Sequence, residues 1–525
     1  MRRAPRLTAV AMVLAGSVLL SRVLGYAREA VLARELGASA ATDAYYAAFQ
    51  IPDLLNYFLA GGALSIAFVP FYTRVLAQEG PGAAEALLAK VTGTMGALTL
   101  AATVVLWWQA DALVALQFPR FAPETQALTA RLTRIVLPAQ VFFIAGGILR
   151  AALMAHGRFA TQALAPLIYN GAIIAGGLAF GPQYGAEGFA WGALVGAAFG
   201  AFGVAWIDAR VGLRLRAWFR VAPFDRQVLH YLAVAAPLML GVSLTTTDEW
   251  YDRWFGALLA SGTVAHLAYA RRLMQLPVAV VGQAIATAAL PTLSRLWSEG
   301  KREALDAVMQ TTLQVGLGLS VLAAGASIVF AAPIVEVVYR RGAFSAEDAA
   351  AVTSLLRAFS IGVPAWVLQQ IAVRAFYARN DTWRPMLLGT VLSLAAIPLY
   401  LAFGPRWGAV GLAWAGVIAM LANTLVTLLL ARRLHGAPGL ARLAASGARA
   451  GVIAALAAVA GAATQLGRPG TAGALLDLGL GFSAFGAVAL GLAFVLGDAP
   501  LRDAMRRLAR RFGRIGGKKG AAPTP

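Results

Sequence analysis

Long apolar stretches without a single charged residue recur along this chain and constrain it more than any motif. A helix needs about 20 mostly apolar residues to cross the hydrocarbon core of a bilayer. The charge-free stretches near this length or longer are 91–110, 159–186, 227–247, 273–294, 309–335, 385–405, 407–431, 450–467 and 478–497. Charged residues make up only 13% of the chain, against roughly 25% in an ordinary soluble domain. The pattern predicts an integral membrane protein and excludes a soluble enzyme.

Further segments have the right length but carry one or a few internal charges. They are 8–33, 42–73, 126–150, 188–207, 254–272 and 349–373. No turn signal separates 254–272 from 273–294, so we treat these two as one long span. The total predicts an all-α integral membrane protein with about 14 transmembrane helices.

Basic residues are distributed unevenly between alternate loops. Lysine and arginine near span ends are retained on the cytoplasmic side of a membrane. With the N-terminus inside, the outside loops hold only Arg34, Arg120, Arg340, Arg341, Arg406 and Arg468. A basic tail at 502–519 suits anionic lipid headgroups. Both termini are therefore predicted to be cytoplasmic, and the net charge of +20 needs no nucleic acid to explain it.

An internal repeat is visible in the sequence. Leu178-Ala179-Phe180-Gly181-Pro182 recurs 223 positions later as Leu401-Ala402-Phe403-Gly404-Pro405, and the Gly, Ala and Trp residues that follow recur at the same offset. Six predicted spans separate the copies, so both enter the membrane in the same direction. This predicts two parallel six-helix bundles around a central cavity, with alternating access between them, plus two extra C-terminal helices.

The predicted organisation has five parts. They are an N-terminal six-helix bundle at 1–210, a cytoplasmic basic linker at 211–226, a C-terminal six-helix bundle at 227–436, two extra helices within 437–498 and a basic tail at 499–525.

Arginines lie within predicted spans, where a charge costs about 2.5–3.5 kcal/mol on insertion scales. Arg22 and Arg28 lie in the first span and Arg272 in the eighth. With few acids beside them, these guanidinium groups favour an anionic ligand, because they bind phosphate in a bidentate manner. The alternative is that each arginine pairs with a neighbouring acid or reaches the membrane interface.

Acidic residues gather in the seventh span. Asp248 and Asp252 are four apart and share a helix face, which suits a cation or proton site. Pairing with Arg253 or Arg271 is an equal alternative.

Nothing in the sequence indicates catalysis. The chain has no cysteine and four scattered histidines, and none of them has zinc-site spacing. No Walker A sequence is present. A secondary transporter without cofactor or metal is the class that remains.

Several sequence blocks resemble the MurJ (MviN) family of lipid II flippases, in the multidrug/oligosaccharidyl-lipid/polysaccharide exporter superfamily. The most specific blocks are Ser21-Arg22-Val23-Leu24-Gly25-Tyr26-Ala27-Arg28-Glu29, Ala41-Thr42-Asp43-Ala44, Ile51-Pro52-Asp53-Leu54-Leu55, Gly62-Ala63-Leu64-Ser65-Ile66-Ala67-Phe68-Val69-Pro70, Tyr269-Ala270-Arg271-Arg272-Leu273-Met274-Gln275-Leu276-Pro277, Arg341-Gly342-Ala343-Phe344 and Ala375-Phe376-Tyr377-Ala378. The resemblance covers nearly the whole chain.

The resemblance implies a fourteen-helix fold with a V-shaped cavity in the bacterial cytoplasmic membrane. Its implied activity is movement of lipid II, the undecaprenyl-pyrophosphate-linked peptidoglycan precursor, to the outer leaflet, with cell-wall polymerases as possible partners. Essential cavity residues of the family correspond to Arg22, Arg28, Asp43 and Arg272 here.

The chain departs from the family pattern at three places. Asn56-Tyr57 replaces a basic pair, Gly61 replaces a glutamate, and Arg271 occupies a position that is often acidic. Asn56 and Arg271 are therefore candidate substrate-binding residues with altered chemistry.

Three other functions stay open from the residues. A drug/cation antiporter of the MATE type would use the acidic seventh span. A flippase for another polyprenyl-pyrophosphate glycan would use the same arginines, and a membrane scaffold would leave the intramembrane charges unexplained.

Overall fold

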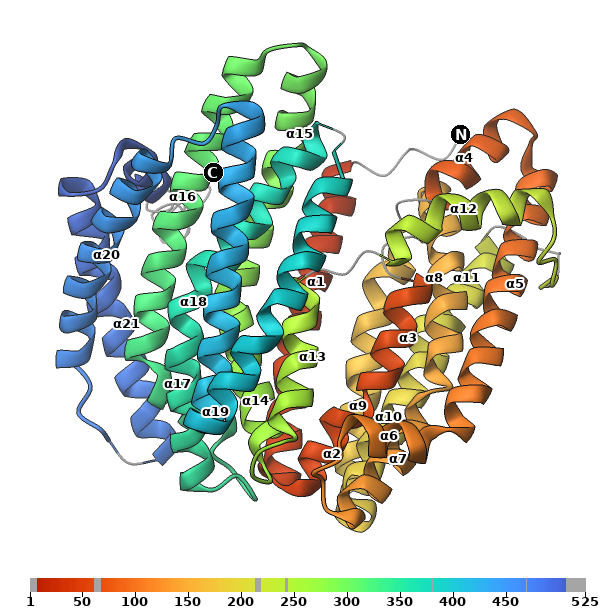
Figure 1. Cartoon of the computed structure of the whole chain (residues 1–525), viewed down its shortest axis with the longest axis horizontal. Coiled ribbons are helices and arrows are strands. Elements are labelled where there is room, and N and C mark those ends of the chain that lie inside the picture. Colours follow the sequence, from red (N-terminus) through yellow and green to blue (C-terminus); the bar gives the residue numbers. More distant parts are fainter. Residues whose placement is uncertain are drawn as a thin grey trace, which may run out of the picture. The chain divides into compact units, whose positions relative to one another are not determined.

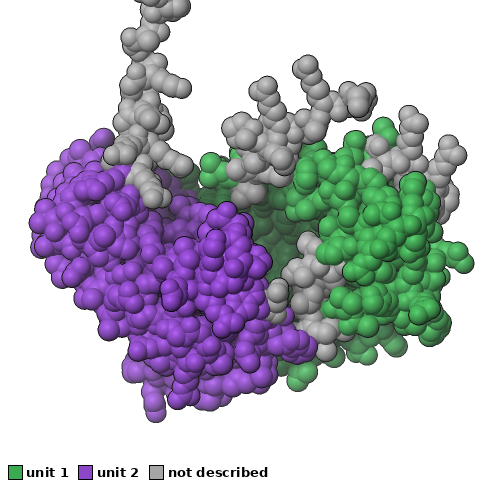
Figure 2. Space-filling model, turned by 90° about the horizontal axis from the view of Figure 1, so that it is seen from above, with its two compact units in different colours: residues 1–241, 256–265, 341–345 green, residues 242–255, 266–340, 346–525 purple. Residues whose placement is uncertain are grey.

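The computed structural model describes residues 7–60, 68–212, 219–240, 244–379, 381–468 and 470–506. Within these ranges the regular elements are helices, and no strand occurs. Figure 1 shows their course. The chain divides into two compact units, which are coloured in Figure 2 and described separately.

Unit 1 comprises Met1–Gly241, Gly256–Ala265 and Arg341–Ser345. Its helices are α1 (Leu7–Leu36), α2 (Ala40–Ala48), α3 (Gln50–Ala60), α4 (Val69–Gln78), α5 (Pro81–Trp108), α6 (Ala110–Gln117), α7 (Pro123–Val136), α8 (Ala139–Ala155), α9 (Ala160–Tyr184), α10 (Ala186–Gly196), the π-helical turn η2 (Ala197–Gly203), α11 (Val204–Gly212) and α12 (Arg226–Leu240). A core that includes Phe68, Tyr72, Leu87 and Tyr231 packs α4, α5, α8 and α12 together.

Unit 2 comprises Val242–Phe255, His266–Arg340 and Ala346–Pro525. Its helices are α13 (Leu244–Gly256), α14 (Thr263–Pro277), the π-helical turn η3 (Val278–Gln283), α15 (Ala284–Ser298), α16 (Arg302–Val329), α17 (Ala331–Tyr339), α18 (Ala346–Ala378), α19 (Trp383–His435), α20 (Leu440–Ala463) and α21 (Gly470–Val495). The first residues of α14 and the last of α13 belong to unit 1. Phe330 and Phe485 lie in the core that joins α20 and α21 to the rest of unit 2.

The two units contain matching helices, which confirms the predicted repeat in the fold. Helices α5 and α16 each have 28 residues, and each is followed by a short helix, α6 or α17. Gly185 ends α9 with φ 55° and ψ −128°. Gly408, its counterpart in the repeat, interrupts α19 with φ 60° and ψ −143°. Glycine recurs at this break because other residues rarely adopt a positive φ.

Ten helices among the described residues are long and apolar enough to cross a membrane. One of them, α19, has 53 residues and contains both of the spans predicted on either side of Arg406. The all-helical membrane fold is confirmed, while the count of fourteen and the proposed domain limits stay predictions.

The single span predicted over 254–294 is wrong at its start. Helix α13 runs to Gly256, and α14 begins only at Thr263. Gly262 lies between them with φ 86°. A positive φ is incompatible with a continuous α-helix, so the chain turns here, which the sequence analysis did not predict. From Thr263 the span continues to Ser298.

Candidate functional site

Arg28 of α1 lies at the centre of a polar cluster in unit 1. Its Nη2 atom is 2.5 Å from Glu29 Oε1, and its Nη1 donates to Asn170 Oδ1 of α9 at 3.1 Å. Tyr46 of α2 donates to the other Glu29 oxygen at 2.5 Å. The premise that few acids lie beside the predicted arginines is therefore wrong for Arg28. The cluster holds its guanidinium group in one orientation, with 18% of the side chain exposed.

Arg22 lies on the same helix and is half-buried. Six residues separate it from Arg28, which corresponds to about 9 Å along the helix axis. Both positive groups are thus presented by one helix, α1.

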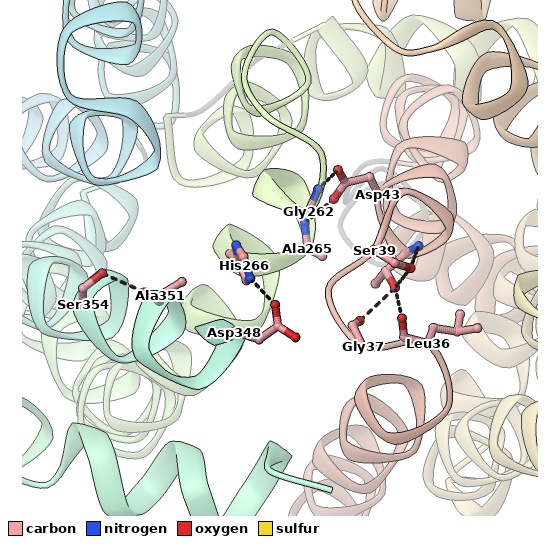
Figure 3. A network of polar contacts seen from close by, with 11 residues as sticks. Leu36, Gly37, Ser39, Asp43, Gly262, Ala265, His266, Asp348, Ala351 and Ser354 are labelled. Atoms are coloured by element: carbon pink, nitrogen blue, oxygen red, sulfur yellow. Dashed lines mark hydrogen bonds and ion pairs between the residues drawn. The ribbon is translucent and has the colours of Figure 1, made fainter. Parts of the chain in front are cut away.

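Asp43 of α2 holds the first turn of α14. Its two carboxylate oxygens accept hydrogen bonds from the backbone N–H groups of Gly262, at 2.6 Å, and Ala265, at 2.8 Å (Figure 3). The first N–H groups of a helix have no partner inside the helix, and a carboxylate satisfies them well. Asp43 is 2% exposed, so its observed role is that of a helix cap.

Asn56 of α3 is joined to α8. Its Nδ2 donates to Gln140 Oε1 at 2.8 Å, and Gln140 is 3% exposed. The other family departure in this region, Gly61, lies outside the described residues.

Unit 2 brings three of the predicted residues into one ion cluster. Arg271 Nη1 lies 2.7 Å from Asp248 Oδ2, and Arg271 Nε lies 2.5 Å from Asp252 Oδ2. Trp366 of α18 also donates to Asp248 Oδ2, at 3.1 Å. Of the two pairings left open for the acidic group, the one with Arg271 is confirmed. Arg272, the next residue of α14, is half-buried in the same unit.

Sequence reasoning missed four residues of these clusters, namely Glu29, Tyr46, Asn170 and Trp366. Glu29 could have been found, because it directly follows Arg28 in a block already selected. Asn170 and Trp366 each lie in a long apolar segment, where a single polar or aromatic residue gives no signal of its partner.

Among the described residues, no group of three or more His, Asp or Glu side chains could hold a metal ion. The clusters contain no nucleophile with an adjacent base that would indicate catalysis. Repeated helical units with guanidinium and carboxylate groups inside their spans define a polytopic membrane transporter.

Comparison with known families identifies the kind of transporter. The family model described as "Lipid II flippase MurJ" matches residues 32–468. This chain therefore belongs to the MurJ family of lipid II flippases.

Individual relatives and structures agree with that placement. The chain is 31% identical over 431 residues to the "Lipid II flippase MurJ" of Burkholderia cenocepacia, covering 80% of this chain and 82% of the relative. A solved structure described as "Lipid II flippase MurJ, inward closed conformation" has a TM-score of 0.78 at 22% identity, covering 92% of this chain and 99% of that chain. A MATE family transporter of the MOP superfamily has a TM-score of 0.66 at 15% identity, covering 79% and 94%. At these identities the two structures show the fold alone.

Proposed function

We propose that this chain moves lipid II from the inner to the outer leaflet of the cytoplasmic membrane by alternating access. The observation that carries the proposal is the arginine pair on α1. Arg28 is held in a fixed orientation within α1, a segment predicted to cross the membrane, in a chain whose family is that of lipid II flippases. A guanidinium group in this setting recognises a phosphate anion through paired hydrogen bonds.

In this mechanism, Arg22, Arg28 and Arg272 neutralise the diphosphate while the isoprenoid tail stays in lipid. Glu29 and Asn170 orient Arg28 without consuming all of its five N–H donors. An inside-negative membrane potential favours outward movement of an anionic headgroup by about 2.3 kcal/mol per charge per 100 mV. The same potential draws the empty, positively charged site back.

Three of the predicted substrate-binding residues contact other parts of the protein in this proposal and do not bind the headgroup. They are Asp43, Asn56 and Arg271. Asp43 positions the start of α14, the helix that carries Arg272. Asn56 joins α3 to α8, and Arg271 joins α13 to α14. We therefore assign them as positioning residues rather than as direct ligands of the headgroup.

The proposal includes an orientation and an organisation. Both termini face the cytoplasm, and the halves 1–210 and 227–436 move against each other. The remaining two helices contact membrane lipids, and cell-wall polymerases take up the delivered precursor. Most of the predicted basic tail, 507–525, lies outside the described residues.

The test is complementation of a cell depleted of its own flippase. Single replacement of Arg22, Arg28 or Arg272 by Ala should abolish growth rescue, with lipid II accumulating in the cell. Arg131→Ala is the matched control, because it removes an exposed arginine paired with Glu187. Full rescue by all three variants at normal protein levels would refute the proposal. Accumulation of a different polyprenyl-linked glycan would identify the substrate as that glycan.

The MATE-type alternative is disfavoured by the ion cluster in unit 2. A cationic drug site in the seventh span would need an accessible carboxylate. Asp248 and Asp252 each accept a hydrogen bond from Arg271 and are at most 4% exposed. Neither carboxylate is therefore accessible to a drug.

A further inference from the structure

Asp248 and Asp252 lie one turn apart on α13 and face α14. Two buried carboxylates in this arrangement favour uptake of a positive charge, because two unpaired anions in a protein interior are costly. In this chain the positive charge is already present. The Arg271 guanidinium bridges the two carboxylates with contacts of 2.7 Å and 2.5 Å.

The bridging guanidinium is fixed from several directions. Its centre lies 4.6 Å from the Phe359 ring and 5.9 Å from the Trp366 ring, both within the range of a cation–π interaction. The Arg271 side chain is 5% exposed, and the two aspartate side chains are 3% and 5% exposed. The cluster is therefore enclosed by protein.

The cluster contains polar atoms that could still bind a ligand. Asp248 Oδ1, Asp252 Oδ1, Arg271 Nη2 and Tyr400 Oη are buried, and none has a hydrogen-bond partner among the described residues. Oxygen ligands for a cation are thus in place, but a second positive charge would lie close to the guanidinium and be repelled.

We propose that Arg271 is a tethered counter-cation, which occupies the place that Na⁺ would take between Asp248 and Asp252. Unit 2 therefore does not bind Na⁺, and the transport cycle of the proposed function runs without it. Removal of Arg271 turns the two carboxylates into a Na⁺ site. The transport part of this inference rests on the proposed function, whereas the binding part rests on the cluster alone.

The first experiment measures thermal unfolding of the purified full-length chain in NaCl and in choline chloride at equal ionic strength. The Tm of the natural chain should be the same in both salts. Arg271→Ala should lower the Tm in choline by roughly 5 °C or more, because it leaves two buried carboxylates unpaired. Added Na⁺ should restore part of this loss in a saturable manner.

Two variants control the result. Arg271→Ala combined with Asp248→Asn should no longer respond to Na⁺, since one of the two anionic ligands is neutral. Arg131→Ala removes the same charge at an exposed pair with Glu187, and its Tm should match that of the natural chain in both salts. A variant that folds only in NaCl supports the inference as well.

Direct binding of ²²Na⁺ gives a readout that does not depend on the stability of a variant. The natural chain should bind no more ²²Na⁺ than its Asp248→Asn/Asp252→Asn double variant. Saturable binding that the double variant loses would overturn the inference, as would a folded Arg271→Ala protein that is indifferent to Na⁺. Neither measurement involves lipid II. If the flippase assignment failed, both measurements would therefore still test the binding part of the inference.

Discussion

Single polar residues inside the spans of this protein work in pairs with defined geometry. Arg28 is held by Glu29 and Asn170, and Asp43 accepts hydrogen bonds from the backbone N–H groups of Gly262 and Ala265 at the start of α14. Such pairing is expected, because an unpaired polar group costs several kcal/mol inside a membrane. In the proposed mechanism, some of these side chains bind the headgroup directly and others only position a neighbouring helix.

Replacing Arg28 by Lys should lower transport without removing it. Lysine keeps the positive charge, but its single ammonium group lacks the planar fork that contacts Glu29 and Asn170 together. We expect about a tenfold or larger loss of lipid II transport in reconstituted vesicles, equal to roughly 1.4 kcal/mol per factor of ten. Asn170→Ala should cause a smaller loss. Activity of Arg28→Lys equal to that of the natural chain would show that charge alone suffices.

The Asn56–Gln140 contact predicts a change in stability. Asn56→Leu leaves the buried Gln140 amide without this partner, which costs roughly 1–3 kcal/mol. The Tm in detergent should fall by a few degrees. Adding Gln140→Leu should recover part of the loss, because the unsatisfied group is then removed. If Asn56→Leu leaves the Tm unchanged, the contact contributes nothing to stability.

At the scale of elements, two short segments join unit 1 although unit 2 flanks them in sequence. Gly256–Ala265 is held by Asp43 and by the core around Phe118. Arg341–Ser345 is held by the Ala343 N–H, which donates to the Arg34 carbonyl at 2.8 Å. Their attachment to unit 1 depends on close backbone contacts. Replacing a glycine at such a contact by a larger residue should therefore weaken the attachment.

Gly342→Ala should loosen the Arg341–Ser345 segment. A Cβ atom at Gly342 would lie 2.3 Å from the Arg34 carbonyl oxygen, and the residue has φ +59°. We expect faster tryptic cleavage at Arg340 and Arg341 and a lower Tm. Gly300→Ala is the matched control, because Gly300 also has a positive φ, +71°, but open space around it. Equal cleavage rates in both variants would mean that a Cβ atom at Gly342 does not loosen this segment.

The described end of the linker is attached to α5. The Arg220 N–H donates to the Ala89 carbonyl at 3.0 Å, and the Ala222 N–H donates to Thr94 at 3.0 Å. Lys90 Nζ lies 2.6 Å from Asp225 Oδ2. Residues 219–225, which were predicted only as part of a basic linker, thus form a strap on unit 1.

The strap predicts a pH dependence. The hydrogen bond from Lys90 lowers the pKa of Asp225. The pair therefore stabilises the fold above the ordinary aspartate pKa of about 3.9, and this stabilisation is lost as the pH falls through the lowered pKa. Lys90→Met should lower the Tm at pH 7, and its difference from the natural chain should shrink below about pH 3.9. Lys301→Met, at an exposed pair with Glu299, should change little at either pH.

At the scale of the whole molecule, the uneven basic loops predict the orientation in the membrane. The chain has no cysteine, so single introduced cysteines report on sidedness directly. Ala122→Cys and Leu466→Cys should react with a membrane-impermeant maleimide added to intact cells. Ser298→Cys should react only after the membrane is opened. All three positions are exposed, and the reverse labelling pattern would invert the proposed topology.

The sequence alone determined the membrane class, most spans and the repeat, while the anion-binding character of the site stays a prediction. The membrane class and the spans follow from local hydropathy, and the repeat follows from comparing strings of residues within one chain. The sequence also selected Arg28, Asp248 and Asp252, because a charge inside a predicted span is conspicuous by itself, whereas Asp43 was selected through the resemblance to the family. Its one clear failure in the fold, the start of α14, came from overlooking the turn at Gly262.

Only the tertiary structure decided what each of these charges binds. Asp43 binds Gly262 and Ala265, which are separated from it by 219 and 222 positions in the sequence. Arg271 contacts two aspartates at once, at sequence separations of 19 and 23. Local pattern cannot rank such partners, because every buried charge has several candidates of opposite sign and the packing of helices selects among them. For this reason the sequence left ion binding and internal pairing as equal alternatives, and the fold resolved them.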